Sequence, residues 1–143
     1  MKLVEEGKVG LDNPVKQYLP WFELKNKNFT DSVTVRQLLQ HKSGFERRYG
    51  FYDPKTSDVT VYEKKLAAYI KNINIRHAPG TSFLYCNLNY VLLGLIINNV
   101  THQSYADYLA GNIIPDIGMK NTYFTVKDNH EHGLIQPYHY QIW

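Results

Sequence analysis

The segment at residues 88–100, LNYVLLGLIINNV, constrains the fold of this chain more than any other stretch. Its apolar side chains point in nearly every direction around a helix, so a helix here needs cover on most of its circumference. Its longest apolar run, residues 90–97, is far too short to cross a bilayer, which takes about 20 residues. The segment therefore predicts a helix that is buried on several sides in a globular core.

Composition and charge agree with a globular protein and exclude some partners. Hydrophobic residues make up 43% of the 143 residues and charged residues 20%, which is ordinary for a domain that buries a core. The formal net charge of +3 is small, and the 16 basic residues are scattered along the chain. Nucleic-acid binding is therefore not expected, because it depends on a concentrated basic surface. The single cysteine excludes a disulfide within the chain.

Signals for helix starts recur along the rest of the chain, and one strand is expected. Asp12 or Asn13 should cap a short helix that has Pro14 at its first position. Residues 121–126, NTYFTV, favour a strand because β-branched and aromatic residues cluster there. Capping boxes, in which a Ser or Thr is followed three residues later by an amide or acidic residue, predict further helix starts. They lie at residues 34–37, 60–63 and 104–107.

Tyr85 and Asn87 stand two residues apart at the start of the apolar helix, just after a Pro-Gly turn. In an extended segment such side chains point the same way, so both are expected to face one cleft while Cys86 turns into the protein. A cleft tyrosine can transfer protons where nearby cations lower its pKa from about 10, and an asparagine can donate to and accept from a substrate amide. The alternative is structural: an unrelated tyrosine that precedes a helix with Asn87 as its N-cap.

Four stretches of the chain follow one another in an order that is typical of one superfamily. They are LVEEGKVGLDNPVKQYLP, TVRQLLQHKSGF, PGTSFLYCNLNYVLLGLIINNVT and GMKNTYF, and they extend over residues 3–124. Together they resemble the serine β-lactamase and penicillin-binding-protein superfamily, in particular its class C-like and DD-peptidase-like branch, whose usual forms are LLxHxSG, PGxxFxYSN, YxLLGxII and PLGMxxT. Tyr85 and Asn87 fall on the second catalytic motif of this superfamily, Tyr-x-Asn. The resemblance therefore implies that these two are catalytic residues.

The chain departs from the superfamily pattern at four positions. Cys86 stands where serine or alanine is usual, and Lys42 replaces a common threonine. His102 occupies a place where glycine often follows the apolar helix, and Pro115 lies one place earlier than in the form PLGM. These differences concern details of the loops, on which the substrate depends.

Two other catalytic motifs of the superfamily are missing from the chain. The first, Ser-x-x-Lys, supplies the nucleophile and a lysine that helps to deprotonate it, and no serine here has a lysine three residues later. The third, Lys or His followed by Ser or Thr and then Gly, normally lies well downstream on a sheet strand. Residues 42–44 match its letters but precede Tyr85, and we interpret them as the HxSG turn with Gly44 ending a helix. The resemblance places the nucleophilic serine and its lysine before Met1, outside this chain.

The resemblance implies an α+β parent fold in which a helical region packs on an antiparallel sheet. Residues 1–143 would be a single, partial unit of this β-lactamase/transpeptidase-like fold, mainly α-helical with short strands and lacking most of the sheet. The parent would be an extracytoplasmic serine hydrolase that acts on a β-lactam, a D-alanyl peptide or an ester through an acyl-enzyme. Neither a cofactor nor a metal is implied. Without the other two motifs, the chain alone is expected to be inactive.

A second function remains open for the chain. It could be a stand-alone, non-catalytic module that binds peptidoglycan-like or peptide ligands in the cleft of Tyr85, and a Ser-x-x-Lys segment encoded just upstream would decide against this. A chain without most of the sheet also leaves part of the apolar helix without its cover. An exposed apolar patch larger than a few hundred Å² should then remain, so we expect a homo-oligomer or a partly molten chain.

Three other groups of residues are considered as sites. Residues 130–132, His-Glu-His, with His139 could offer imidazoles to zinc, but no HExxH pattern or paired cysteines accompany them, so a polar loop is favoured. Cys86 could be a nucleophile with a histidine partner, but no partner position is indicated and a small buried thiol is favoured. His41 is expected to be a hydrogen-bonding residue of the HxSG turn, near the cleft.

Overall fold

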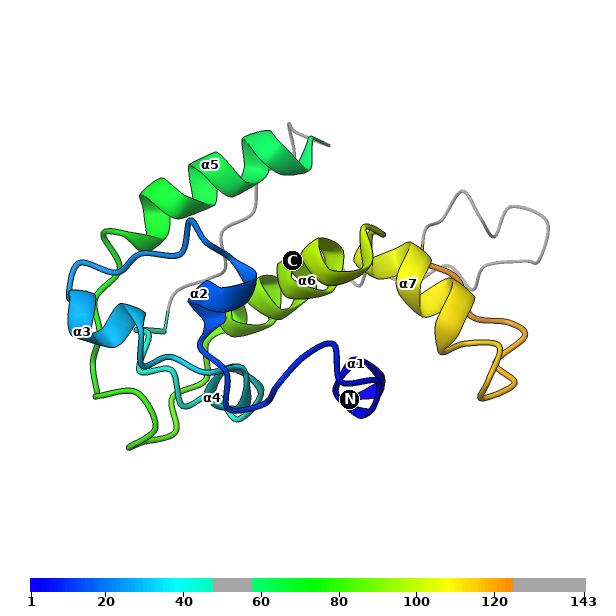
Figure 1. Ribbon diagram of the computed structural model, residues 1–143, viewed down its shortest axis with the longest axis horizontal. Coiled ribbons are helices and arrows are strands. Elements are labelled where there is room, and N and C mark those ends of the chain that lie inside the picture. Colours follow the sequence, from blue (N-terminus) through cyan, green and yellow to red (C-terminus); the bar gives the residue numbers. More distant parts are fainter. Residues whose placement is uncertain (48–57, 125–143) are drawn as a thin grey trace, which may run out of the picture. The chain divides into compact units, whose positions relative to one another are not determined.

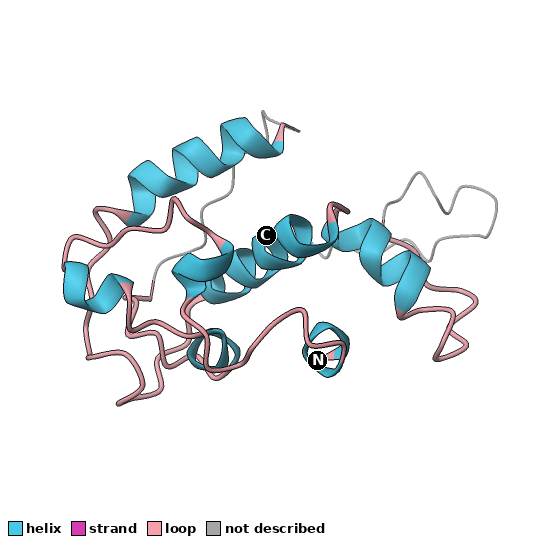
Figure 2. Cartoon of the chain, in the orientation of Figure 1, coloured by secondary structure: helices cyan, strands magenta, loops and turns pink. Residues whose placement is uncertain are grey.

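The structure is a computed structural model that describes residues 1–47 and 58–124. It divides into two compact units, Met1–Ser104 and Tyr105–Trp143. The regular elements of the described residues are all α-helices, which agrees with the expected mainly helical chain (Figures 1 and 2). In chain order they are α1 (Lys2–Glu5), α2 (Val15–Tyr18), α3 (Lys27–Thr30), α4 (Val35–Leu39), α5 (Val59–Ile70), α6 (Asn87–Thr101) and α7 (Tyr105–Asn112).

Regular strands are not found in residues 1–47 and 58–124, so the expectation of short strands is wrong there. In these ranges β-pairing is limited to two isolated antiparallel bridges, Pro14 with Thr34 and Phe45 with Ile75. The strand expected at residues 121–126 does not form over 121–124, and its last two residues lie outside the described part. The physical reason is that β-branched and aromatic residues favour a strand only where a neighbouring strand completes the ladder.

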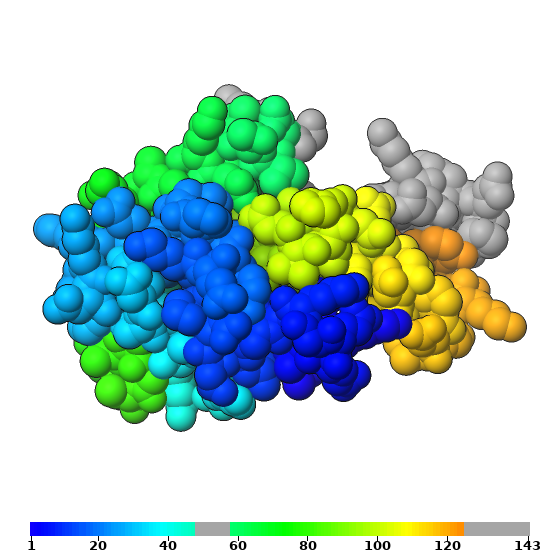
Figure 3. Space-filling model, viewed as in Figure 1, coloured from blue at the N-terminus to red at the C-terminus, as the bar shows by residue number. Residues whose placement is uncertain are grey.

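Helix α6 forms the core of the first unit. Its buried apolar residues share one face at helical spacing: Leu88, Leu92, Leu95 and Ile96. The helix packs against α2 and α4, and in the space-filling view the blue N-terminal segments cover its first turns (Figure 3). The apolar residues on its other faces are half-buried: Val91, Leu93, Ile97 and Val100. The predicted helix is confirmed, but full burial is confined to one face rather than to several sides.

The C-terminal end of α6 explains one departure from the superfamily pattern. His102 is the C-cap of the helix and has a left-handed backbone with φ 57°, and its N–H donates to the Asn98 carbonyl at 2.8 Å. Glycine adopts this conformation at no steric cost, whereas other residues are strained in it. The superfamily's preference for glycine at this place therefore follows from the left-handed helix end. His102 adopts the same conformation with some strain.

Helix starts agree with the sequence signals at α4 and differ at α5. Thr34 and Gln37 form the predicted capping box: the Thr34 hydroxyl accepts from the Gln37 N–H at 3.3 Å, and Gln37 Oε1 accepts from the Thr34 N–H at 3.1 Å. The start of α5 lies two residues before the expected one, because the Asp58 carboxylate accepts from the N–H groups of Thr60 and Val61 at 2.8 and 3.2 Å. A carboxylate upstream of Thr60 therefore replaces the predicted hydroxyl cap.

The start of α2 also differs from the prediction, which gave the cap to Asp12 or Asn13. Pro14, expected as the first helical residue, is the N-cap itself. The side chain of Asp12 instead binds Arg36, and Asn13 Nδ2 donates to the hydroxyl of Tyr18 at 2.9 Å. Both predicted caps are thus engaged in longer-range contacts that tie the loop to other parts of the unit.

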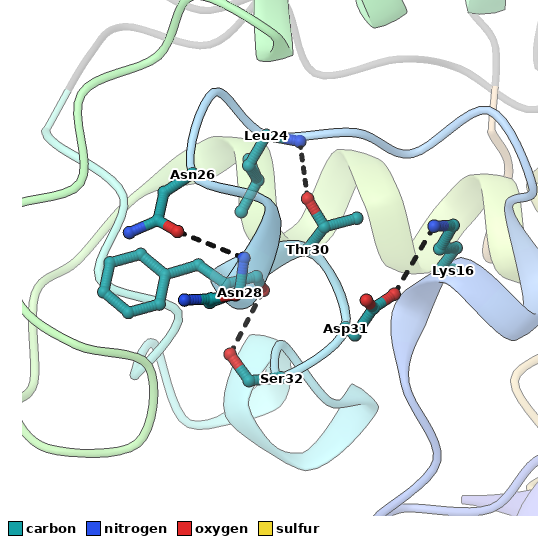
Figure 4. Close-up of polar contacts among 8 residues, drawn as sticks. Lys16, Leu24, Asn26, Asn28, Thr30, Asp31 and Ser32 are labelled. Atoms are coloured by element: carbon teal, nitrogen blue, oxygen red, sulfur yellow. Dashed lines mark hydrogen bonds and ion pairs between the residues drawn. The ribbon is translucent and has the colours of Figure 1, made fainter.

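The short helix α3 was not expected from the sequence. Its N-cap is Asn26, whose side-chain oxygen accepts from the Asn28 N–H at 3.1 Å (Figure 4). The buried hydroxyl of Thr30 accepts from the Leu24 N–H at 2.9 Å, which closes the loop around the helix (Figure 4). These side-chain bonds satisfy backbone groups that a single helical turn cannot satisfy itself.

The second unit begins with α7 directly after Ser104, where the third capping box predicts a helix start. Tyr108 is the buried residue of this helix, and a turn with Gly118 in the left-handed conformation, φ 69°, follows it. Across residues 1–47 and 58–124, none of the helices is long and apolar enough to cross a membrane.

Candidate active site

The HxSG turn lies against the segment that carries Tyr85, because backbone hydrogen bonds join the two. The carbonyl groups of His41 and Lys42 accept from the N–H groups of Leu84 and Gly80 at 2.8 and 2.7 Å. These bonds link parts of the chain that are about 40 residues apart in the sequence. They place the turn directly beside the Tyr-x-Asn motif.

Helix α4 ends at Leu39, with Gln40 as its C-cap and His41 as the left-handed residue that follows, and not at Gly44 as the sequence had suggested. His41 has a left-handed backbone with φ 54°. Its N–H donates to the Leu38 carbonyl at 3.1 Å, and the Lys42 N–H donates to the Gln37 carbonyl at 2.8 Å. Together these two bonds form a Schellman motif, the usual way of ending a helix with one left-handed residue. The helix end therefore fixes the backbone of His41.

Gly44 allows the HxSG turn to lie close to the backbone of residues 76–77. Its φ is 82°, and a Cβ atom added to it would overlap the backbone carbonyl oxygen of His77. Its own carbonyl accepts from the Arg76 N–H at 2.8 Å. Only glycine permits both the left-handed backbone and this close approach.

Tyr85 and Asn87 face the same side of the chain, as predicted from their spacing. The Tyr85 hydroxyl donates to Asn87 Oδ1 at 2.6 Å, and the Tyr85 side chain is 48% exposed. Cys86 between them is buried, also as predicted. The N-cap of α6 is Cys86, with Asn87 as the first helical residue, so the alternative that Asn87 is an N-cap is wrong. The catalytic role of the pair remains a prediction.

Four aromatic rings meet at this place. The centroid of the His41 ring lies 4.5 Å from that of Tyr85, 5.1 Å from that of Tyr90 and 5.9 Å from that of Phe83. The three partners of His41 are largely exposed. The Tyr90 hydroxyl also donates to the Leu39 carbonyl at 3.4 Å, which ties the first turns of α6 to the end of α4. His41 thus supports an exposed aromatic surface around Tyr85.

A buried polar cluster behind this surface was missed from the sequence. Ser43 and Asn89 are both fully buried, and the Ser43 hydroxyl donates to Asn89 Oδ1 at 2.6 Å. Asn89 Nδ2 lies 3.1 Å from His41 Nδ1, which also accepts from the Cys86 N–H at 3.4 Å. An asparagine on the buried face of an apolar helix was the signal that could have revealed the cluster, because buried amides require partners.

The thiol and the possible metal ligands considered from the sequence add no further group to the candidate site in the described residues. The buried Cys86 agrees with the predicted buried thiol. No set of three His, Cys, Asp or Glu side chains suited to a metal ion occurs in the part of the chain that the structure describes. His139 and the His-Glu-His run at residues 130–132 lie outside that part.

Comparisons with known proteins concern the family and the fold of the chain. A family model described as Beta-lactamase matches residues 1–141. Protein flp of Staphylococcus aureus (strain MW2) is 35% identical over 124 residues, which are 87% of this chain and 25% of that protein. The octameric penicillin-binding protein homologue from Pyrococcus abyssi superimposes with a TM-score of 0.72 at 31% identity, over 93% of this chain and 31% of the other. A class C β-lactamase in complex with cefoxitin gives a TM-score of 0.65 at 29% identity, over 85% of this chain and 31% of the other.

The matched regions are short compared with the relatives. The chain spans about a quarter of the length of Protein flp and less than a third of each of the two solved structures. It is thus a part of the β-lactamase/transpeptidase-like fold, and in the described residues this part is mostly helical. Because the family model matches nearly every residue, the chain belongs to the beta-lactamase family.

Proposed function

We propose that this chain is the helical, Tyr-x-Asn-bearing part of an extracytoplasmic serine hydrolase that acts on a β-lactam, a D-alanyl peptide or an ester through an acyl-enzyme. The observation that carries the proposal is the contact of the Tyr85 hydroxyl with Asn87 Oδ1 at 2.6 Å, on an exposed edge at the start of α6. Membership of the family and the likeness to a class C β-lactamase solved with cefoxitin support this choice of substrates.

The roles of the two residues follow from their chemistry. In the complete site, Tyr85 would exchange a proton with the nucleophilic serine and the leaving group, and Asn87 would bind an amide of the substrate. In the present geometry the phenol donates a hydrogen bond to Asn87 Oδ1, which leaves the amide nitrogen of Asn87 available as a donor. A cationic neighbour, such as the lysine of the Ser-x-x-Lys motif, favours the loss of that proton when the site is complete.

The same reasoning predicts that the chain alone is inactive. Acyl transfer needs an activated nucleophile and donors for the oxyanion, and no serine here has a lysine three residues later. We expect neither hydrolysis of a chromogenic cephalosporin nor labelling by a fluorescent penicillin. Covalent labelling of the isolated chain at any serine would contradict this.

The complete protein provides the test of Tyr85. Replacing Tyr85 by Phe should lower turnover by about 10²-fold or more while leaving the fold intact, because only the proton-transferring oxygen is lost. Cys86→Ser in the neighbouring position is the matched control and should leave turnover almost unchanged. Near-normal rates for both variants would remove Tyr85 from the mechanism.

We further propose that the isolated chain associates with copies of itself through its apolar surface. The apolar residues on the outer faces of α6 are only half-buried, and each one left exposed forgoes about 1.5–3 kcal/mol of burial. Size-exclusion chromatography with light scattering should show a dimer, larger species or a partly molten chain. A sharp monomer peak at 16.7 kDa with cooperative unfolding would contradict this and favour the non-catalytic binding module.

A further inference from the structure

A line of hydrogen bonds runs from the HxSG turn to the Tyr-x-Asn motif. The Phe45 N–H donates to Ser43 Oγ at 3.4 Å, and the Ser43 hydroxyl donates to Asn89 Oδ1 at 2.6 Å. Asn89 Nδ2 then meets His41 Nδ1 at 3.1 Å, and the Cys86 N–H reaches the same nitrogen at 3.4 Å. Both ends of the line are backbone N–H groups, which can only donate.

This arrangement determines which nitrogen of His41 carries the proton. The Ser43 oxygen accepts from the Phe45 N–H and its hydroxyl donates to the Asn89 carbonyl oxygen, and the Cys86 N–H points at His41 Nδ1 from the other end of the line. The amide nitrogen of Asn89 must then face His41 and donate to it. A flipped amide would require a proton on His41 Nδ1, and that proton would oppose the Cys86 N–H. His41 Nδ1 thus faces two donors, which favours the tautomer with the ring proton on Nε2.

We infer that His41 is a positioning residue for Tyr85, held in the Nε2–H tautomer by Ser43 and Asn89. The inference rests on the proposed function, because it assigns the support of that same Tyr85. His41 acts on both sides of the tyrosine: its carbonyl holds the Leu84 N–H at 2.8 Å, and its Nδ1 holds the Cys86 N–H.

The ring and the backbone of His41 complete this support. Its ring lies 4.5 Å from the ring of Tyr85 between centroids, tilted by 43°. The helix end of α4 fixes its backbone at φ 54°. A catalytic group held in one orientation spends less of its time in unproductive geometries, so the loss of this support should slow the chemical step rather than weaken substrate binding.

The tautomer is tested by long-range proton–nitrogen NMR on the complete protein labelled with ¹⁵N-histidine, with His41 identified by its absence in His41→Asn. The expected spectrum has an unprotonated Nδ1 and a protonated Nε2. In Ser43→Ala the amide of Asn89 loses its fixed orientation, and a fraction of the Nδ1–H form should appear. A wild-type ring that carries its proton on Nδ1 would overturn the inference.

The positioning role is tested by kinetics of the same protein, with active sites counted by acylation. His41→Asn keeps an acceptor oxygen and tolerates the left-handed backbone but removes the ring, so kcat should fall about tenfold with KM changed less than about twofold. His102→Asn is the matched control, since His102 also has a left-handed backbone, φ 57°, at the far end of α6. It should leave kcat unchanged.

The outcomes separate this inference from the proposed function. A slow Tyr85→Phe variant beside a fully active His41→Asn variant would overturn the positioning role alone. A normal Tyr85→Phe variant would contradict the proposed function and the positioning role together. A slow His41→Asn variant beside a normal His102→Asn variant, in a protein with the expected tautomer, would support both.

Discussion

Two junctions in the first unit join segments that are far apart in the sequence. One has an exposed ion pair and the other a buried hydrogen bond between neutral side chains. The N-terminal junction joins residues 11–15 to residues 33–36, with backbone bonds such as the Val15 N–H to the Val33 carbonyl at 2.8 Å. The motif-two junction joins residues 41–46 to residues 74–84 through similar backbone bonds, and to Cys86 and Asn89 through side chains. In both, backbone pairing sets the path of the chain, and side-chain contacts complete the junction.

The difference lies in where the side chains sit. Asp12 and Arg36 form a two-bond ion pair at 2.7 and 2.8 Å in the N-terminal junction, with side chains that are 75% and 44% exposed. Ser43 and Asn89 form a neutral bond at 2.6 Å in the motif-two junction, and both are fully buried. Exposed ion pairs contribute little because water solvates the separated charges nearly as well, whereas a buried group left without its partner cannot find water. Substitutions in the buried motif-two junction should therefore cost more stability than substitutions in the exposed, charged N-terminal junction.

The largest effect should come from the backbone of the motif-two junction. Gly44→Ala places a methyl group on the carbonyl oxygen of His77 at a left-handed position, so the junction must open, and we expect a loss of about 3 kcal/mol or more in unfolding free energy. Gly7→Ala is the control, since Gly7 has a similar φ of 70° with nothing within 4 Å of the added Cβ. Its cost should be the strain alone, about 1–2 kcal/mol. Equal costs in urea unfolding would show that the close approach is unimportant.

The next effect should come from the buried hydroxyl. Ser43→Ala leaves Asn89 Oδ1 and the Phe45 N–H without their partner in a site closed to water, so we expect a loss of about 1–3 kcal/mol. Ser32→Ala removes an exposed hydroxyl that donates to the Phe29 carbonyl at 3.2 Å, and it should change the stability by less than about 0.5 kcal/mol. A Ser32 variant as unstable as the Ser43 variant would break the ranking by burial.

The features that sequence reasoning predicted depend on rules that act over a few residues. The alternation of side chains in an extended segment placed Tyr85 and Asn87 together and Cys86 inside. The capping box at α4 needed only Thr34 and Gln37. In each case the deciding contacts are made within three residues, so the letters were sufficient.

The features that it missed depend on contacts across the chain. Asn89 and His41 are 48 residues apart, and Asn89 and Ser43 are 46 apart, so no local pattern marks the three as one cluster. The left-handed His41 was missed because glycine is the usual signal for such a helix end, and Gly44 three residues later drew the prediction instead. No strand forms over residues 121–124, because a strand depends on a neighbouring strand and not on its own letters alone.

The smallest effect should come from the exposed ion pair of the N-terminal junction, and it should depend on pH. The hydrogen bond from Arg36 holds the pKa of Asp12 below its usual value, and the charge of Arg36 adds to this. Because the folded-state pKa is lower than the unfolded one, the pair contributes stability above the unfolded value, near 3.9, and loses it as the pH falls through the folded-state pKa. Asp12→Asn should thus lower the urea midpoint slightly at pH 7, and the variant and the wild type should converge as the pH falls through the folded-state pKa of Asp12. Asp31→Asn, which loses only a single contact with Lys16 at 3.4 Å, should change the midpoint less.

Added salt should narrow the difference in urea midpoint between Asp12→Asn and the wild type at pH 7, since both charges of the pair are exposed to solvent. If Asp12→Asn lowered the midpoint as much as Ser43→Ala, charge would outweigh burial, and the order of the two junctions would be reversed.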